Sequence, residues 1–362
     1  MNNTAAGNNA GGNLCPYFGR CGGCTLQDID YEKQLAQKKE FLREAFKRGG
    51  IACIPDVTVI PSKPFEYRSR LQMRRVPYGT EAEFSTGKSR LRPLNRARKF
   101  ARKQEARCGF MTRSGGNKTG VTIVPVNDCR IADPVIREAL QAGSIIPPVD
   151  RDRFCVYGKD STLLVQGQNS RGAARIRQKD LAIDAGVFFQ SNAALLELLI
   201  DKILSVAADA RKELPAADFY CGVGTFAAFL QDGFERMDLL EADREAVSLA
   251  RQNVKHKGAR FFGQKDAVWA LNMGRLIRET YGLAVVDPGR QGLSAEMSRF
   301  LRGGCEILCY VSCNPNALAR DTALLLTPPD GARGGLKLEA LDFYDFYPQT
   351  KHIESLAVFR RG

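Results

Sequence analysis

The spacing of apolar residues changes character along this chain of 362 residues. From Tyr31 onward, Leu35, Leu42 and Phe46 recur at intervals that bring them roughly to one face of a helix. Three prolines between residues 55 and 64 then end that pattern. The first part of the chain therefore predicts a helix that begins at Tyr31, with residues 31–59 forming this helix, packed on a larger domain, and a linker.

A different pattern follows, in which apolar runs are short and are separated by Gly, Asn and Asp. In the stretch FEYRSRLQMRRVPYG (residues 65–79), Arg68, Arg70 and Arg74 recur at alternate positions. The stretch FCVYGKDSTLLVQGQNSRGAARIRQ (residues 154–178) continues in the same style. Period-two alternation with turn residues is typical of strands. We expect a β-rich domain formed by residues 60–180 together with the loop at 14–30.

Beyond residue 181, apolar strands alternate with helical patterns. AADFYCGVGTFAAFL (216–230) has the order strand, Gly turn and helix, and RMDLLEADREAVSLARQNVKHKG (236–258) repeats it. LAVVDPGRQG and CEILCYVSCNP are apolar runs that end in turn residues, as parallel strands buried on both faces do. The predicted fold class is α/β: a Rossmann-like doubly wound sheet over residues 181–362 beside a smaller β-rich domain.

Charge narrows the class of partner. The net charge is +13, and residues 61–120 hold 16 Lys and Arg against 4 Asp and Glu. A concentrated basic segment favours a polyanionic partner such as nucleic acid, because neutralising phosphates releases counterions. A solvated surface with poor charge balance is the alternative.

The N-terminal residues, the apolar runs and the cysteines indicate in which cellular compartment the protein lies. Residues 1–13 lack the basic and apolar regions of a signal peptide and are expected to form a disordered tail. No apolar run approaches the ~20 residues that span a membrane, so we expect a cytoplasmic protein without a membrane partner. Its 11 cysteines would then be metal ligands, catalytic groups or buried packing residues rather than disulfides.

A nucleotide site is indicated at DFYCGVGTF (residues 218–226), where Gly222 and Gly224 follow a strand. Such a turn lets the backbone approach a ligand, and Glu241 at the end of the next strand can accept ribose hydroxyls. A lone G-x-G also suits a dehydrogenase or an ordinary strand-to-helix turn. The third glycine of the dinucleotide motif is missing, so S-adenosylmethionine, which has no phosphate, fits better.

A metal site is indicated near the N-terminus. Cys15, Cys21 and Cys24 have C-x5-C-x2-C spacing in a Gly-rich loop, and Cys129 offers a distant fourth thiol. Four thiolates suit tetrahedral zinc or a [4Fe–4S] cluster, and the spacing does not separate the two.

Three reactive side chains fall at predicted strand ends. Asp287 in VVDPGR and Cys313 in VSCNP end apolar runs, while Glu354 begins the last one. Ligands of open α/β sheets lie beyond the carboxyl ends of strands, so Asp287 and Cys313 can face the ligand at the Gly turn. A buried structural role for Cys313 is the alternative. Only two histidines occur, which leaves metal-hydrolase arrangements without support.

Together these motifs resemble the RNA (uracil-5-)-methyltransferase family. The matching stretches run in the family's order from residue 15 to 358: CPYFGRCGGC, YRSRLQMR, DCRIADP, FFQSN, DFYCGVGTF, VVDPGRQG, YVSCNPNALARD and YPQTKHIES. The single stretches are weak signals, whereas their ordered combination is specific. Two departures are Gly289, where the family usually has proline, and the lack of room for the small N-terminal β-barrel that many members carry.

The resemblance implies a methyltransferase sheet, a [4Fe–4S] cluster in the β-rich domain, and specific roles for residues. The cluster ligands would be Cys15, Cys21, Cys24 and Cys129. The S-adenosylmethionine contacts would be Gln190, Tyr220, Gly222, Gly224, Thr225, Glu241, Asp266 and Asp287. Cys313 would be the nucleophile and Glu354 the proton acceptor, with Asp287 also bonding the pyrimidine edge.

The implied mechanism follows known chemistry. Addition of the Cys313 thiolate to uracil C6 makes C5 reactive toward a methyl donor, and Glu354 then removes the C5 proton. The target base must leave its stack, so we expect structured RNA as partner and base flipping into a cleft between domains. Flanking phosphates would be held by Arg68, Arg70, Arg74, Arg75, Arg96, Arg98, Lys99, Arg102 and Lys103.

The expected product is 5-methyluridine in 23S ribosomal RNA, made by a monomer. Transfer RNA is the alternative substrate, and a non-catalytic metal-containing RNA-binding protein is the alternative from another class. The preference for ribosomal RNA comes from the missing barrel combined with the retained cysteines.

Overall fold

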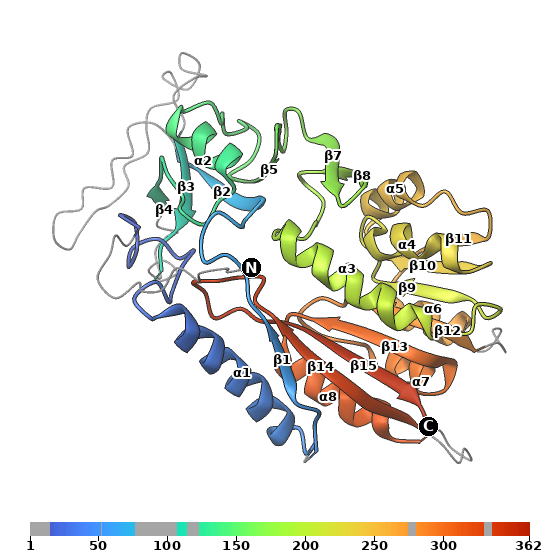
Figure 1. Ribbon diagram of the computed structural model, residues 1–362. Coiled ribbons are helices and arrows are strands. Elements are labelled where there is room, and N and C mark those ends of the chain that lie inside the picture. The colour runs from blue at the N-terminus through green and yellow to red at the C-terminus, as the bar shows by residue number, and fades with distance from the viewer. Residues whose placement is uncertain (1–14, 52, 77–106, 114–122, 274–279, 329–334) are drawn as a thin grey trace, which may run out of the picture.

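The computed structural model describes residues 15–51, 53–76, 107–113, 123–273, 280–328 and 335–362. The predicted tail at 1–13 and the basic residues Arg96, Arg98, Lys99, Arg102 and Lys103 lie outside these ranges. The described chain contains an eight-stranded sheet, a five-stranded sheet and a separate hairpin (Figure 1). Within the same ranges, no helix has the length and apolar character needed to cross a membrane.

The helices are α1 (Tyr31–Arg48), α2 (Pro134–Gln141), α3 (Ala193–Ala208), α4 (Thr225–Leu230), α5 (Arg244–Asn253), α6 (Asp266–Met273), α7 (Ala295–Gly304) and α8 (Pro315–Leu326), with a 3-10 turn η2 (Gln231–Gly233). From edge to edge, the large sheet contains β1 (Val57–Ile60), β14 (Leu336–Tyr344), β15 (Glu354–Arg361), β13 (Cys305–Ser312), β12 (Tyr281–Val286), β9 (Ala216–Phe219), β10 (Met237–Glu241) and β11 (Ala259–Gly263). The five-stranded sheet contains β4 (Ile123–Pro125), β3 (Arg107–Met111), β2 (Arg70–Val76), β5 (Arg153–Lys159) and β6 (Thr162–Val165), and the hairpin pairs β7 (Arg171–Ile176) with β8 (Lys179–Asp184).

The large sheet is mixed rather than purely parallel. Its strands pair in parallel except β15, which lies antiparallel between β13 and β14. Helices connect most of the parallel strands, as the alternating sequence pattern predicts. β14 instead turns into β15 through the loop at 345–353 without a crossover helix, and such a direct return produces an antiparallel pair.

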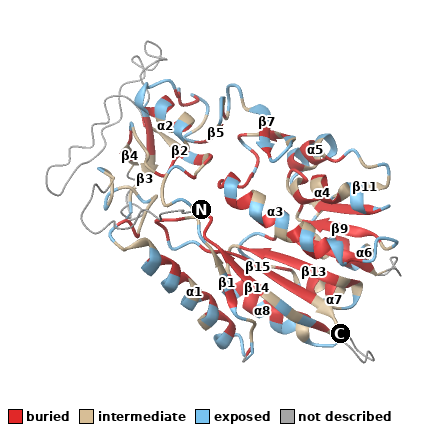
Figure 2. Cartoon of the chain, viewed as in Figure 1, coloured by how far each residue is buried: buried red, intermediate tan, exposed pale blue. Residues whose placement is uncertain are grey.

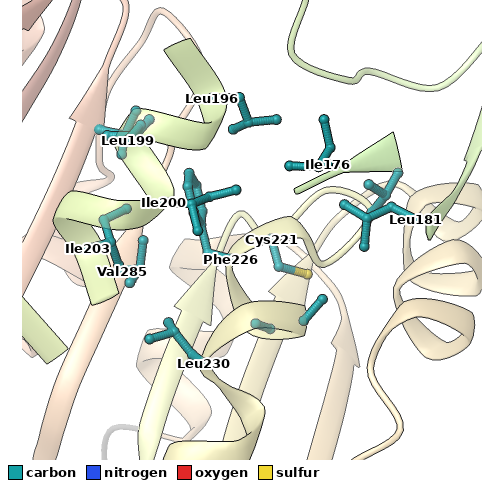
Figure 3. Close-up of a cluster of buried hydrophobic side chains, with 14 of the residues drawn as sticks. Ile176, Leu181, Leu196, Leu199, Ile200, Ile203, Cys221, Phe226, Leu230 and Val285 are labelled. Carbon is teal, nitrogen blue, oxygen red and sulfur yellow. The ribbon is translucent and has the colours of Figure 1, made fainter. Parts of the chain in front are cut away.

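Helices cover both faces of this sheet, so the strands are buried on both sides (Figure 2). One face packs against α3, α4 and α5, and Figure 3 shows Leu196, Leu199, Ile200 and Ile203 of α3 in one buried cluster with Val285 of β12. The other face packs against α1, α6, α7 and α8. This is the doubly wound arrangement that the sequence predicts.

Two segments depart from their expected places. Residues 57–60 belong to the predicted linker, yet they form edge strand β1, paired in parallel with β14 at residues 341–344. A run of four residues between prolines is too short to show strand periodicity. The hairpin β7–β8 spans the expected domain boundary at residue 180, and its Ile176 and Leu181 pack in the core of the large sheet (Figure 3).

The N-terminal segment is fastened to the loop at 345–353. The backbone N–H groups of Thr25 and Leu26 donate to the Gln349 carbonyl oxygen at 2.8 and 3.1 Å. The Gln34 amide donates to Gln349 Oε1 at 2.9 Å, and the buried Lys38 ammonium lies 2.6 Å from an Asp345 oxygen. Residues 25–38 therefore clasp the loop that leads into β15.

Because of the strand directions, several strand ends lie at one edge of the large sheet. β9, β10, β12 and β13 run in parallel, so their carboxyl ends share an edge of the sheet. Because β15 is antiparallel, its first residues join that edge: Ser355 pairs with Ser312, the last residue of β13. Ligands of such sheets bind beyond this edge.

Candidate active site

The turn after β9 has a backbone geometry that glycine favours. Gly222 and Gly224 have φ values of +54° and +79°, in the left-handed region. A Cβ atom built at Gly222 would meet no heavy atom within 4 Å, whereas one at Gly224 would lie 3.1 Å from Ala250. The space beside Gly222 is therefore open, and the turn brings bare backbone to its edge.

Tyr220 just before this turn is also left-handed, at φ +62°, which is strained for an aromatic residue. Its hydroxyl donates to Asp266 at 2.6 Å, and the Ser294 N–H donates to the same carboxylate oxygen at 3.0 Å. Asp266 begins α6, and Thr225 begins α4. The pair Tyr220–Asp266 thus fixes the strained backbone beside the open space. Strain of this kind is characteristic of functional sites.

Glu241 reaches the same turn from the end of β10. Its two carboxylate oxygens accept the N–H groups of Gly222 at 3.1 Å and Asp243 at 2.8 Å. A carboxylate has about four acceptor positions, so capacity for ribose hydroxyls remains. The chain's own residues therefore fit an adenosine group with no phosphate to bind.

The side chains of Gln190 and Asp287 contact each other. The Gln190 amide donates to an Asp287 oxygen at 3.4 Å, and Gln190 Oε1 is buried without a partner. Burial raises the pKa of Asp287 to about 7; the Gln190 bond opposes this, and the Glu241 charge adds to it. Burial also raises the pKa of Asp218, inside β9, to about 7. Several acids therefore lie at this edge, and among the described residues neither Asp287 nor Asp218 pairs with a cation.

Cys313 and Glu354 complete this edge. Cys313 follows β13 directly and is half-buried, while Glu354 opens β15, is 2% exposed, and has a buried Oε1 without a partner. Burial raises the pKa of the Cys313 thiol to about 11, and the charges of Glu354 and Asp287 raise it further, while Arg290 lowers it. Burial, and then Asp287, also raise the pKa of Glu354 well above its usual range. The charge of Asp287 thus raises the pKa of both other predicted catalytic side chains, and the charge of Glu354 raises the pKa of Cys313.

Several nearby residues were missed by sequence reasoning. Arg290 contacts His352 at 3.0 Å, and the His352 ring lies edge-on to Tyr347, with 5.8 Å between centroids. Phe188, two residues before Gln190, is 58% exposed, although its neighbours Val187 and Phe189 are buried in the core. An alternating in-and-out pattern in GVFFQ is the signal that could have identified Phe188 as exposed.

Comparisons with known proteins show what this chain is similar to. No protein-family profile matches the chain. An RNA methyltransferase of uncharacterised specificity from Treponema denticola is 29% identical over 96% of this chain and 83% of its own length. The 23S rRNA (uracil(1939)-C(5))-methyltransferase of Pseudomonas entomophila is 27% identical over 96% of this chain and 80% of its own.

The chain is therefore similar over nearly its whole length to RNA (uracil-5-)-methyltransferases. The fold agrees with this similarity. The Pyrococcus abyssi tRNA (uracil-54, C5)-methyltransferase, solved with S-adenosyl-L-homocysteine, has a TM-score of 0.63 at 21% identity, over 93% of this chain and 85% of its own. The large sheet is therefore an S-adenosylmethionine-dependent methyltransferase fold.

The four cysteines predicted to bind a metal come from two segments of the chain: Cys15, Cys21 and Cys24 from one, and Cys129 from the other. Among them, Cys21 and Cys15 raise the pKa of Cys24, and Cys24 and Cys21 raise that of Cys129, in each case adding to the larger effect of burial. Because such charge effects weaken with distance, the thiols lie near one another. Among the described residues, however, no group of three or more His, Cys, Asp and Glu side chains is arranged to hold a metal ion.

The described arginines among those expected to bind RNA differ in their surroundings. Arg68 lies 5.6 Å from the Tyr347 ring centroid. Arg70 is occupied internally, donating to Cys155 Sγ and the Ala185 carbonyl oxygen at 3.3 Å and lying 5.9 Å from the Phe188 ring. Arg74 and Arg75 are half-buried on β2.

Proposed function

We propose that this protein transfers a methyl group from S-adenosylmethionine to C5 of a uridine in RNA, through a temporary bond between Cys313 and C6. The observation that carries the proposal is the meeting of Cys313, Asp287 and Glu354 at one sheet edge, with Glu354 Oε1 buried and unpaired. An unpaired buried carboxylate is costly unless a ligand meets it. Similarity to RNA methyltransferases, among them a 23S rRNA (uracil(1939)-C(5))-methyltransferase, supports the reaction class.

Residues already described would hold the methyl donor. Glu241 would accept its ribose hydroxyls, the open turn at Gly222 would lie against it, and Gln190, Tyr220, Thr225, Asp266 and Asp287 would complete its surroundings. When bound, S-adenosylmethionine supplies an electrophilic methyl group to a carbon nucleophile.

Cys313 would create that nucleophile. Uracil C5 is unreactive until a thiolate adds to C6, which places charge density at C5 and on the O4 side of the ring. The thiol is largely protonated in the ligand-free protein, since its pKa is raised to about 11. Arg290 lowers that pKa and is the cation placed to stabilise the thiolate, with His352 holding its guanidinium.

Glu354 would complete the cycle. After methylation, C5 carries both a methyl group and a proton, and the Glu354 carboxylate takes the proton. The electron pair of the C5–H bond re-forms the C5–C6 double bond, and the C6–S bond breaks to release the Cys313 thiolate. Asp287, held by Gln190, would bond the pyrimidine edge and orient it.

The test uses RNA that contains 5-fluorouridine. Fluorine cannot leave C5 as a proton, so wild-type protein with S-adenosylmethionine should form a complex that survives denaturing electrophoresis. Cys313→Ala should form none while still binding RNA. Equal trapping by Cys313→Ala would show that the nucleophile is wrongly assigned.

For the substrate, we propose 23S ribosomal RNA. The Pseudomonas entomophila 23S rRNA enzyme is 27% identical to this chain over 80% of its own length, whereas the tRNA (uracil(54)-C(5))-methyltransferase of Schizosaccharomyces pombe is 26% identical over 64% of its own length. Nucleoside mass spectrometry of separated ribosomal and transfer RNA from a strain lacking this protein decides between them. Loss of 5-methyluridine from transfer RNA alone would overturn the choice of 23S ribosomal RNA.

We also propose that Cys15, Cys21, Cys24 and Cys129 hold a [4Fe–4S] cluster. Support comes from the four neighbouring thiols and from the preference of such clusters for thiolate ligands. The cluster would brace two chain segments. Protein purified without oxygen should contain about four iron atoms per chain and absorb near 400 nm; bound zinc without iron would contradict the proposal.

A further inference from the structure

The two faces of the five-stranded sheet differ in character. Directly opposed residues of antiparallel strands lie on the same face, so the pairing register assigns each side chain to a face. One face packs against α2 (Figure 1). The buried cluster on that side joins Ile136, Ala139 and Leu140 of α2 to Leu71, Met73, Cys108, Val124, Phe154, Val156 and Val165 of the sheet. The side chains between these positions along each strand belong to the opposite face.

That opposite face carries a group of arginines. Arg74 of β2 pairs with Arg153 of β5, and Val76 of β2 pairs with Arg107 of β3. Residues 72, 74 and 76 alternate with the buried positions of β2, so Gln72 and the three arginines share this face. Gln72, Arg107 and Arg153 are exposed, and Arg74 is half-buried. Opposed Cβ atoms lie about 5 Å apart and diagonal ones about 7–8 Å, so the three arginines are close neighbours.

These arginines lack acidic neighbours within the sheet. None of the strands β2, β3, β4, β5 and β6 contains Asp or Glu. Among the residues that the structure describes, no ion pair involves Arg74, Arg107 or Arg153. Arg74 and Arg107 also belong to residues 61–120, the segment with 16 Lys and Arg against 4 Asp and Glu. The excess positive charge that favours a polyanion is therefore present on this face itself.

Strand β2 connects this face to the catalytic edge. The Ser69 N–H, directly before β2, donates to the Ser191 carbonyl oxygen at 2.7 Å, and Ser191 follows Gln190 in the chain. Arg70 begins β2, and Arg74 lies four residues further along it. That separation is about 13 Å at the usual rise of a strand. A polynucleotide on this face would therefore lie within a few nucleotides of a base bound beside Gln190.

We propose that this face of the five-stranded sheet binds a single-stranded segment of the RNA substrate next to the target uridine, with Arg74, Arg107 and Arg153 on its phosphates. The inference rests on the proposed function and extends it by naming a contact surface and the form of RNA that it takes. Gln72 Nε2 donates to Cys155 Sγ at 4.0 Å, which leaves the carboxamide oxygen and a second N–H for a base edge.

The size of the face favours a single strand over a duplex. Strands β3, β2 and β5 are neighbours in the sheet, and three neighbouring strands span only about 10 Å. Domains that recognise double-stranded RNA contact successive grooves over about 16 base pairs, whereas sequence-specific recognition uses unpaired nucleotides whose base edges are free. The target base must also leave its stack, which is easiest where the neighbouring nucleotides are unpaired.

The test compares Arg107→Gln and Arg153→Gln with the control Arg299→Gln. Each change removes one exposed cation from the full chain, and Arg299 lies on α7, away from the five-stranded sheet (Figure 1). Urea denaturation checks that the variants fold like wild type. Dissociation constants are measured at several salt concentrations with a short uridine-containing RNA oligonucleotide, both alone and paired with its complement.

We expect Arg107→Gln and Arg153→Gln each to bind the single strand about fivefold more weakly and to lower the slope of log affinity against log salt by about 0.7, while Arg299→Gln changes little. Equal losses in all three variants would show a diffuse charge effect and overturn the face as the contact surface. Unchanged affinity in both sheet variants would also overturn it. A loss as large with the paired oligonucleotide would overturn the choice of single-stranded RNA.

Methyl transfer to RNA separates this inference from the proposed function. If the sheet variants lose affinity but wild type transfers no methyl group to any RNA, the proposed function fails and the contact surface stands. If wild type methylates RNA and both sheet variants bind as tightly as wild type, the contact surface fails and the function stands. Wild type that binds no RNA would overturn both.

Discussion

Buried acids occur in two settings in this molecule, at the catalytic edge and away from it. Asp238, inside β10, is 1% exposed and accepts from both Arg260 and Tyr281, the guanidinium lying at 2.6 Å. Asp321, on α8, is fully buried and accepts from Tyr310 at 2.6 Å, Leu293 N–H at 2.8 Å and Arg320. Glu354 is equally buried, yet one of its oxygens has no partner.

The difference separates structural acids from acids that await a ligand. A buried carboxylate surrounded by donors stabilises the fold, because its charge is compensated. A buried carboxylate without donors destabilises the fold, and burial raises its pKa. By this criterion Glu354, which we propose as the proton acceptor, differs from Asp238 and Asp321, whose carboxylates are surrounded by donors.

The largest predicted effect is on catalysis, from Glu354→Gln. The amide cannot accept the C5 proton, so turnover should fall by about 10³-fold, within the usual range for loss of a general base. Because the bond to Cys313 then persists, a covalent complex should accumulate on RNA with ordinary uridine. Turnover assays and denaturing gels measure the two effects.

The same variant should unfold at the same or a higher urea concentration than wild type, since it replaces an uncompensated buried acid. A marked loss of stability would place Glu354 with the structural acids and remove the contrast.

The next effect in size is on folding, from Asp238→Asn. This change weakens the contacts to Arg260 and Tyr281, and we expect the free energy of unfolding to fall by about 1–3 kcal/mol, because Arg260 is partly exposed and can be rehydrated. Methyl transfer per folded molecule should stay near wild type. Urea denaturation and turnover measure the two quantities, and a catalytic loss as large as that of Glu354→Gln would sink the distinction.

A smaller effect concerns the reactivity of Cys313. With its pKa raised to about 11, the thiolate fraction and the rate of alkylation by iodoacetamide should increase about tenfold per pH unit from pH 7 to 9. Glu354→Gln removes the negative charge that Glu354 carries when it is ionised, so the pKa of Cys313 should fall and alkylation at pH 8 should become faster. Mass spectrometry of the peptide containing Cys313 follows the rate, and slower alkylation in the variant would contradict the charge coupling.

The smallest effect concerns Gly289, where the family usually has proline. A Cβ atom there meets no heavy atom within 4 Å, and the backbone is not left-handed. Gly289→Ala should therefore raise the free energy of unfolding by about 0.4–1 kcal/mol through a less flexible unfolded chain. Turnover should change less than twofold; a large catalytic loss would show that the loop carrying Asp287 requires the freedom of glycine.

Much of the catalytic edge could be predicted because it follows local rules. Apolar runs that end in turn residues locate Asp287 and Cys313 at strand ends, and the Gly turn identifies the space beside Glu241. The helix that begins at Tyr31 is likewise predicted by a local pattern of apolar residues. These features need no knowledge of distant contacts.

The remainder depends on contacts between distant parts of the chain. Strand β1 is defined by its pairing with β14, and the reversed direction of β15 depends on where β14 and β13 lie. Whether a buried acid has hydrogen-bond donors around it cannot be predicted from the sequence either, since Asp238 and Arg260 meet only across paired strands.

The loop at 345–353 joins the N-terminal segment to the start of β15. Gln349 accepts hydrogen bonds from Thr25 and Leu26, the two residues that follow Cys24, and five residues later the chain reaches Glu354. A change at Cys24 that displaced Thr25 and Leu26 would therefore shift the loop that leads to Glu354, the residue we propose as proton acceptor.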